Sequence, residues 1–391
     1  MSELSTAEHS ASAAGLQENS LHRGLGTTSI VFMVIAAAAP LAVVAATIPV
    51  VISASTSVAI PLYFVLGAAI LLLFTVGFTT MSRYVANAGA FYSYVQAGLG
   101  RIPGLGGATL AIFSYAGLML ATTSYIGVAI DNVVARYTGV ELAWWIYSGL
   151  VLIVVGWLGY HDIELSSKVL GVALVLEIGV VVALSAAIFE RGGAEGISAA
   201  SLSPAHFVEG NSGLGLMFAF FAFFAFEATT VFRNEAKDPN RTVPRATYVA
   251  VVFIGLFYAI AAFAVINGLG GAAVATASEN PENAVLGLAS TYVGPFFFDL
   301  VQVLVATSLF ACILSFHNVI TRYVYTLSGR GVMPQRLAGV NARHGAPSAA
   351  SLAVSLTAGV AMAIVVLSGL DPVAEAYTWL SGAATWAWSV S

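Results

Sequence analysis

The stretch "FAFFAFEATTVFRNEAKDPNRTVPRA", residues 221–246, places an ionisable carboxylate, Glu227, directly after a cluster of phenylalanines. A charged side chain at membrane depth costs roughly 2.5–3.5 kcal/mol on insertion scales, so an acid kept in such surroundings indicates a specific role. Whether this applies depends on the stretch lying in a membrane. The basic residues that follow within eighteen positions would then anchor its inner end: Arg233, Lys237, Arg241 and Arg245.

The composition is that of an integral membrane protein. Of the 391 residues, 59% are hydrophobic and 8% are charged, whereas a soluble domain carries about 25% charged residues. The apolar residues form runs long enough to cross a bilayer as helices, which takes about 20 residues each. The alternating pattern of outer-membrane barrels is absent. We therefore expect an all-α, multi-pass membrane protein.

Ten hydrophobic segments are predicted to form one transmembrane domain over residues 29–391, behind a disordered cytoplasmic tail at 1–28. The stretch 84–100 is too mixed to span and is expected to lie at the interface. With the N-terminus inside, only Arg136 and Arg191 of the fourteen Lys and Arg residues fall outside, as the positive-inside rule expects. The segments are 30–52, 58–80, 105–131, 142–160, 166–189, 214–233, 246–269, 293–320, 347–369 and 372–390.

Two of these segments are poor continuous helices. In the first, "IAAAAPLAVVAATIP" at residues 35–49 carries Pro40 near its middle, where proline removes a backbone hydrogen bond and breaks or kinks the helix. In the sixth, Glu227 interrupts the apolar run. Pro40 alone would be a tolerated kink, but interruptions five segments apart are typical of inverted-repeat transporters, whose broken helices bind ligands at the midplane.

Three stretches resemble amino acid permeases of the amino acid–polyamine–organocation superfamily. After the sixth segment, Phe223, Phe226 and Glu227 match the family's Phe-x-Gly-Phe-acid pattern, and "EAKDPNRTVPRA" at 235–246 matches its loop motif. The blocks at 82–104 and 318–350 resemble the connections after the second helix and between the eighth and ninth. The resemblance implies a leucine-transporter-type inverted repeat of five plus five helices, with helices 1 and 6 broken and a cytoplasmic N-terminus.

The resemblance also implies a substrate site between helices 1, 3, 6 and 8. An amino acid's carboxylate would meet free N–H groups near Ala38, Ala39, Pro40 and Ala42, at the positive end of a half-helix. Its ammonium would meet carbonyls near Ala36 and in 223–226, under Phe223 and Phe226. The sequence departs from the family in that Ala36, Pro40, Ala42 and Ala225 stand at its glycines, which would narrow the site.

Several further side chains are candidates for the same region. Glu227 is expected to accept hydrogen bonds from N–H groups freed at the breaks, with direct contact to an amine as the second possibility. Tyr115 and Tyr125 on the third helix are weaker aromatic candidates. On the eighth helix, Ser308, Cys312 and Ser315 lie near one face, and with His317 they could line the site, although small polar residues also join helices.

Glu177 is the candidate coupling group. It lies nine residues after Lys168, roughly 13–14 Å along a helix and so near mid-membrane. In several proton-coupled or sodium-independent members of the resembling family a lysine stands there, so the mechanism of those members cannot be transferred to Glu177. The acid could carry a proton, could hold a cation together with Ser308 and Ser315, or could be a structural acid bonded to a neighbouring helix.

The sequence therefore predicts a secondary transporter in the plasma membrane that moves an amino acid by alternating access. Its transmembrane domain would lie in the lipid bilayer, and transport would be coupled to protons through Glu177. A polyamine or amine carrier is one alternative, since an amine would suit Glu227. A transport-fold sensor that binds an amino acid without moving it is another. No signature of an enzyme, metal site, cofactor or nucleic-acid partner is present in the sequence.

Overall fold

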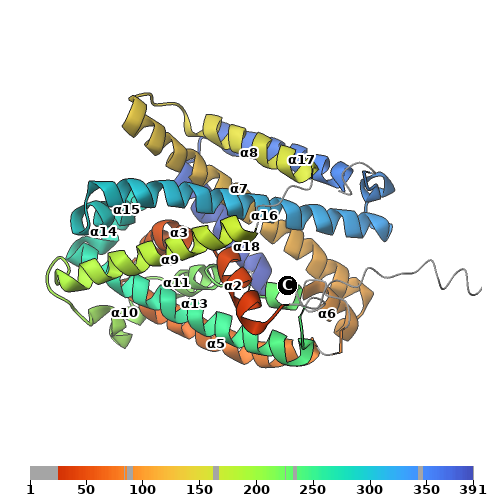
Figure 1. Ribbon diagram of the computed structural model, residues 1–391, viewed down its shortest axis with the longest axis horizontal. Coiled ribbons are helices and arrows are strands. Elements are labelled where there is room, and N and C mark those ends of the chain that lie inside the picture. Colours follow the sequence, from red (N-terminus) through yellow and green to blue (C-terminus); the bar gives the residue numbers. More distant parts are fainter. Residues whose placement is uncertain are drawn as a thin grey trace, which may run out of the picture.

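Long apolar helices account for most of the chain, as the hydrophobic runs predict. The structure, a computed structural model (Figure 1), describes residues 25–82, 84–85, 91–161, 167–224, 226–231, 236–341 and 347–390. Within these residues the β pairing consists of one isolated bridge, between Leu25 and Ala236. The all-α fold class is therefore confirmed. Residues 1–24 of the expected tail lie outside the described residues.

The bundle helices follow the order of the predicted segments. They are α2 (Thr27–Ala37), α3 (Pro40–Ala42), η1 (Val43–Thr47), α4 (Ile48–Ser55), α5 (Ile60–Met81), α7 (Arg101–Thr138), α8 (Trp144–Tyr160), α9 (Ser167–Glu190), α11 (Ser212–Phe221), α12 (Ala228–Val231), α13 (Pro239–Leu269), α16 (Pro295–Gly329), α17 (Ser348–Leu367), η6 (Pro372–Tyr377) and α18 (Thr378–Val390). Short elements connect them: α6 (Phe91–Leu99), η2 (Ala200–Leu202), α10 (Pro204–Val208), η4 (Gly270–Ala272), α14 (Ala273–Glu279), α15 (Pro281–Tyr292) and η5 (Gln335–Ala338).

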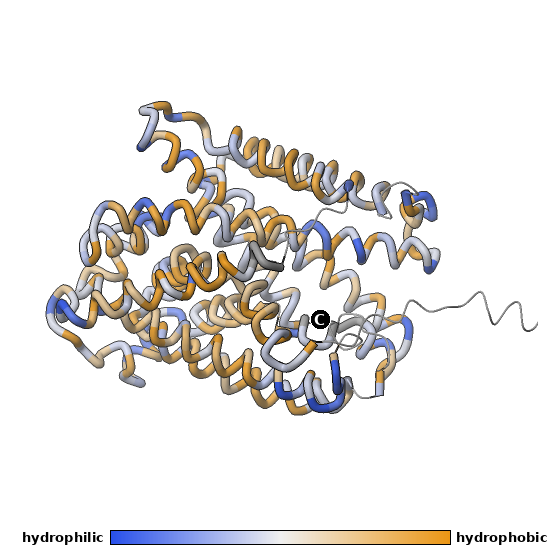
Figure 2. Tube along the Cα trace, viewed as in Figure 1, coloured by the Kyte–Doolittle hydropathy of each residue, from blue (hydrophilic) through white to orange (hydrophobic). Residues whose placement is uncertain are grey.

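Within the described part of the chain, seven helical stretches are long and apolar enough to cross a membrane: Thr27–Ser55, Ile60–Met81, Arg101–Thr138, Gly171–Glu190, Pro239–Glu279, Pro295–Gly329 and Ser348–Leu367. The other three predicted segments correspond to α8, to the interrupted pair α11 and α12, and to η6 with α18. Figure 2 shows hydrophobic residues along the helices and hydrophilic ones mostly toward their ends. This pattern fits a multi-pass helical membrane protein.

Both predicted interruptions are present. In the first segment α2 ends at Ala37 and α3 begins at Pro40. In the sixth, α11 ends at Phe221 and α12 begins at Ala228. Between them the backbone tightens to bonds three residues apart, such as Phe223 N–H to Phe220 O at 3.0 Å. The directions of the side chains that follow Phe221 therefore do not repeat every 3.6 residues, as they would on a regular α-helix.

The half-helix α2 is held against the start of α13. Lys237 N–H donates to Leu25 O at 3.0 Å, which ties the segment before α2 to the segment before α13. Ile30 and Val34 of α2 are fully buried in a small apolar cluster with residues of α13 and its approach: Ala236, Val243, Ala246 and Ala250. The first half of the broken helix, α2, is thus held by the seventh predicted segment, which forms α13.

The long helices pack in pairs around the broken ones. α5 lies along α13, and α7 lies along α16 and α18. α8 and α17 pack on each other at the upper edge of Figure 1 and contact α7 and α16. The close approach of α8 to α7 requires glycine at Gly127, where a Cβ would overlap the Trp144 carbonyl oxygen and the Ser148 hydroxyl.

We expect Gly127→Ala to destabilise the protein by about 1–3 kcal/mol, because an added methyl in a filled helix contact forces the helices apart. Thermal unfolding of the purified protein in detergent would measure this as a lower Tm. Gly149→Ala on α8 is the matched control, since a Cβ there meets nothing within 4 Å. Equal Tm values for the two variants would contradict the close packing of α7 and α8.

Candidate functional site

The break in the first helix has an unusual backbone. A residue before proline is disfavoured in the right-handed helical region, and Ala39, which precedes Pro40, adopts a left-handed conformation with φ 46° and ψ 69°. Such a conformation costs a non-glycine residue on the order of 1–3 kcal/mol. It persists only where surrounding contacts hold it, so the partners of the freed backbone groups decide whether the break is stable.

Two side chains from other helices satisfy these freed groups. The Leu41 N–H, at the start of the second half of the helix, donates to Glu177 Oε2 on α9 at 3.2 Å. The Ala38 carbonyl accepts a hydrogen bond from the Tyr258 hydroxyl on α13, also at 3.2 Å. A bilayer provides no water to satisfy such groups, so Glu177 and Tyr258 together stabilise the break from within.

The other N–H groups of the break are mostly occupied as well. Ala38 N–H donates to Val34 O at 3.0 Å, and Ala39 N–H donates to Ala36 O at 3.2 Å. Pro40 has no N–H. Ala42 is the one position from 38 to 42 whose N–H has no hydrogen-bond partner among the described residues. The expected row of free donors for a substrate carboxylate is therefore reduced to one.

A small cavity, called the central cavity below, lies between the two breaks. Its volume is about 40 Å³, and because a cavity needs about 10–15 Å³ to hold one water, it admits only a few water-sized groups. Backbone and side-chain atoms from the broken first and sixth helices, α7, α16 and η6 line it: Ala37, Ala38, Ala39, Ala42, Val43, Thr47, Thr122, Phe221, Phe224, Leu309, Cys312, Phe316 and Tyr377.

Aromatic side chains close this central cavity in two layers. In the first layer, the Tyr377 ring lies 5.2 Å from the Tyr125 ring and 6.4 Å from the Phe221 ring, and its hydroxyl is 3.0 Å from the Thr47 hydroxyl. In the second, the Phe224 ring lies 4.9 Å from the Tyr115 ring and 5.3 Å from the Trp388 ring.

The two layers are separated along α7. Tyr115 and Tyr125 are ten residues apart on that helix, or about 15 Å at 1.5 Å per residue. Phe316 joins the second layer, 5.9 Å from Tyr115. The central cavity is thus covered by aromatic rings at both ends of its axis along α7.

Glu227 belongs to the second layer. Its side chain is buried, and its Oε1 accepts a hydrogen bond from the Tyr115 hydroxyl at 3.0 Å. Glu227 is therefore joined to a tyrosine of α7. At the break of the first helix, the freed Leu41 N–H donates to Glu177; the hydrogen bonds expected from Glu227 to freed N–H groups stay a prediction.

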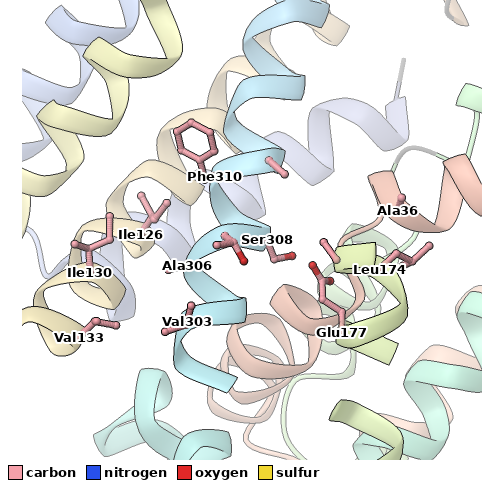
Figure 3. A pocket seen from close by; sticks show the side chains of 13 residues that line it. Ala36, Ile126, Ile130, Val133, Leu174, Glu177, Val303, Ala306, Ser308 and Phe310 are labelled. Atoms are coloured by element: carbon pink, nitrogen blue, oxygen red, sulfur yellow. The ribbon is translucent and has the colours of Figure 1, made fainter. Parts of the chain in front are cut away.

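Glu177 faces a second, larger cavity of about 430 Å³ between α2, α7, α9 and α16. Its lining is apolar apart from Glu177, Thr307 and Ser308, and it includes Ala36. Figure 3 shows the Ser308 hydroxyl pointing across this space toward Glu177. Ser308 is buried, and its Oγ has no hydrogen-bond partner among the described residues.

Phe223 and Phe226 are placed away from the central cavity. Both are fully buried. The Phe223 ring lies over Gly67 of α5 and Gly255 of α13, while the Phe226 ring packs within about 6 Å of Phe78 and Trp388. Phe221 and Phe224 line the cavity in their place. Ala225 lies outside the described residues.

The polar residues of α16 are divided between different surroundings. Ser308 faces the cavity at Glu177, and Cys312 lines the central cavity. Ser315 is exposed and lines neither. His317 is buried, with its Nε2 2.9 Å from the Ser355 hydroxyl of α17, so it joins two helices. Among the described residues, no group of three or more His, Cys, Asp or Glu is arranged to hold a metal ion.

Sequence reasoning did not identify Tyr258, Tyr377, Phe221 and Phe224. Tyr258 and Tyr377 are tyrosines within apolar segments, and nothing local marks them as partners of residues more than 200 positions away. For the phenylalanines, the available signal was their place at the sixth interruption. Which of them faced inward depended on the tightened backbone there.

We expect Tyr258→Phe to lower the free energy of unfolding by about 1–3 kcal/mol, the cost of leaving the buried Ala38 carbonyl without a partner. Thermal unfolding in detergent measures it. Tyr248→Phe on the same helix is the control, because the Tyr248 hydroxyl has no hydrogen-bond partner among the described residues. If both variants unfold at the wild-type temperature, the hydroxyl does not support the break.

Comparisons with known proteins agree with this architecture. The solved structure described as "Inward facing conformation of Mhp1" is similar to the chain, with a TM-score of 0.52, 17% sequence identity, and coverage of 93% of this chain and 76% of that chain. At this identity the likeness shows a shared fold. The search of curated proteins found no significant match. The family model described as "Amino acid permease" matches residues 25–391, and the chain therefore belongs to the amino acid permease family, a family of membrane transporters.

Proposed function

We propose that the protein is a secondary active transporter that moves a small amino acid across the plasma membrane by alternating access. The observation that carries the proposal is the central cavity, which lies where two interrupted helices meet and has an aromatic layer on either side along α7. Interrupted helices in a bilayer are costly, and transporters use them to bind a substrate near the midplane.

The proposed architecture is a leucine-transporter-type repeat of five plus five helices with a cytoplasmic N-terminus. The interruptions fall in the first and sixth of ten segments, as two equivalent halves require. The distribution of basic residues supports the orientation, and the likeness to Mhp1 supports the fold type. In this orientation α7 runs outward, so Tyr115 lies toward the cytoplasm and Tyr125 toward the outside.

Alternating access then corresponds to opening one aromatic layer at a time. Separation of Tyr377 from Tyr125 and Phe221 would admit substrate from outside. Separation of Phe224 from Tyr115, with release of the Tyr115–Glu227 hydrogen bond, would allow it to leave inside. Because α2 is restrained by α13 and the other half of that helix packs elsewhere, the break between them is a natural hinge.

The cavity suits a small amino-bearing substrate. Aromatic faces attract an ammonium group, and Phe221, Phe224, Phe316 and Tyr377 present such rings. The Ala42 N–H is available for one carboxylate oxygen. The narrow volume, with Ala42 in its lining at a position that the resemblance gives as glycine, favours a small side chain.

For coupling, we propose that Glu177 carries a proton. It is a buried acid beside the break and beside a cavity, so a change in its charge alters a contact that holds the first helix in place. Among the described side chains, the ionisable groups that interact with it are Tyr258 and Cys312, and neither supplies a positive charge. Protonation would weaken the hydrogen bond with Leu41 and would accompany movement of the two half-helices.

A carrier of amines is the second candidate, and one observation favours it: of the backbone donors from 38 to 42, only Ala42 N–H is left for a carboxylate. A sensor that binds without transport would keep the same cavity. Accumulation or counterflow of radiolabelled substrate in proteoliposomes separates a transporter from a sensor, because a sensor shows neither.

We expect modification of Cys312 to block transport, because its side chain lines the central cavity and the chain has no other cysteine. A small methanethiosulfonate reagent should abolish most uptake into proteoliposomes, and saturating substrate should slow the inhibition several-fold. Cys312→Ala should resist the reagent. Inhibition of that variant, or the absence of protection by any transported compound, would contradict the placement of the substrate.

We expect Glu177→Gln to retain exchange and lose accumulation. The amide oxygen can still accept from Leu41 N–H, so the break is preserved, but the side chain can no longer carry a proton. Uptake would be measured against an imposed pH gradient, with and without sodium, beside a Glu190→Gln control at the exposed end of α9. Gradient-insensitive uptake by the wild type, or full accumulation by Glu177→Gln, would refute proton coupling through this residue.

A further inference from the structure

Glu177 occupies a place that a substrate carboxylate would use. At the start of the second half of the first helix, the successive N–H groups of Leu41 and Ala42 form a pair of donors, and such pairs bind the two oxygens of a carboxylate. Ala42 lines the central cavity and its N–H is available. The Leu41 N–H already donates to Glu177 Oε2 at 3.2 Å.

We propose that Glu177 is a specificity-determining residue: its carboxylate and the carboxylate of a bound amino acid exclude each other at Leu41, so the protein binds amino acids only when Glu177 is displaced, whereas amines bind with Glu177 in place. This inference rests on the proposed function, since it concerns the substrate of the same cavity. It differs from proton coupling, because competition for a donor applies to binding alone and needs no ion gradient.

The physical basis is that one N–H holds one carboxylate oxygen well. A substrate carboxylate bound only to Ala42 would leave its second oxygen without a donor and would lie beside the negative charge of Glu177. Unpaired buried oxygens are costly, and like charges repel strongly in a low-dielectric interior. An amine without a carboxylate avoids both effects, and its ammonium meets the aromatic rings of the central cavity.

The structure also contains a second place for the displaced Glu177. The 430 Å³ cavity opens beside its side chain, so the carboxylate has space to turn away from Leu41. Ser308 points toward it across that cavity (Figure 3), and the buried Ser308 Oγ has no hydrogen-bond partner among the described residues. The Ser308 hydroxyl is already near enough to interact with Glu177, and it can donate a full hydrogen bond to the acid once Glu177 leaves Leu41, which would stabilise the state that accepts amino acids.

The test compares matched pairs of ligands. Each pair consists of an amino acid and the amine that has the same side chain but lacks the carboxylate. Alanine with ethylamine and leucine with 3-methylbutylamine are suitable. Dissociation constants are measured on purified wild type, Glu177→Ala and Glu177→Gln. Glu190→Gln is the control, since it makes the same change at an exposed position of the same helix. The readout is the ratio of the amine's Kd to the amino acid's Kd.

We expect Glu177→Ala to raise this ratio at least tenfold, because Leu41 N–H is freed for the substrate. Glu177→Gln should raise it less, because its amide oxygen still accepts from Leu41. Ser308→Ala should lower the ratio, because it removes the partner of the displaced acid. Ser308→Ala also tests the inference if Glu177→Ala does not fold.

Ratios equal to the wild type in Glu177→Ala and Ser308→Ala, with binding intact, would overturn this inference and leave the proposed function standing. If Glu177→Ala does not fold, an unchanged ratio in both Glu177→Gln and Ser308→Ala would overturn it in the same way. If no member of any pair binds to the wild type or the variants, the proposed substrate class fails and this inference fails with it.

Discussion

An interrupted transmembrane helix must satisfy its freed backbone groups inside the protein, because the bilayer core offers no water for them. In this protein the requirement is met by two side chains that reach the same break from different helices. Glu177 accepts from Leu41 N–H, and Tyr258 donates to Ala38 C=O. The left-handed Ala39 depends on these contacts, and so does the position of both half-helices relative to α9 and α13.

The central cavity follows from that arrangement. The first helix is broken at 38–39, and the backbone of the sixth is tightened after Phe221. Because neither backbone is regular there, the two helices do not pack closely and leave a small space between them. Aromatic rings then cover it: Tyr377 and Tyr125 at one end, Phe224 and Tyr115 at the other. The ring contacts themselves are apolar and can separate, but opening either layer also moves a tyrosine hydroxyl that is hydrogen-bonded, Tyr377 to Thr47 and Tyr115 to Glu227.

The two acids at membrane depth have different roles in this structure. Glu227 bonds to a tyrosine within an aromatic layer, so its charge is tied to the closure of one side of the cavity. Glu177 bonds to the backbone of the break and faces its own cavity, so its charge is tied to the geometry of the site itself. The sequence showed that both acids lie in apolar segments, where burying a carboxylate is costly without a specific partner. It could not show which partner each acid has.

By itself, the sequence determined the class of the protein, the number of apolar segments and the location of both interruptions. Hydrophobicity over some twenty residues sets the segments. Pro40 removes a helix hydrogen bond wherever it packs, and Glu227 marks the place where the sixth apolar run is interrupted. Only the tertiary structure decided which acid meets which N–H and which rings face the cavity. Leu41 and Glu177 are separated by 136 positions, and Ala38 and Tyr258 by 220; no local pattern specifies such pairs. At Phe221 and Phe224 the helical period is broken, and the direction of a side chain on an irregular backbone is set by the helices packed against it.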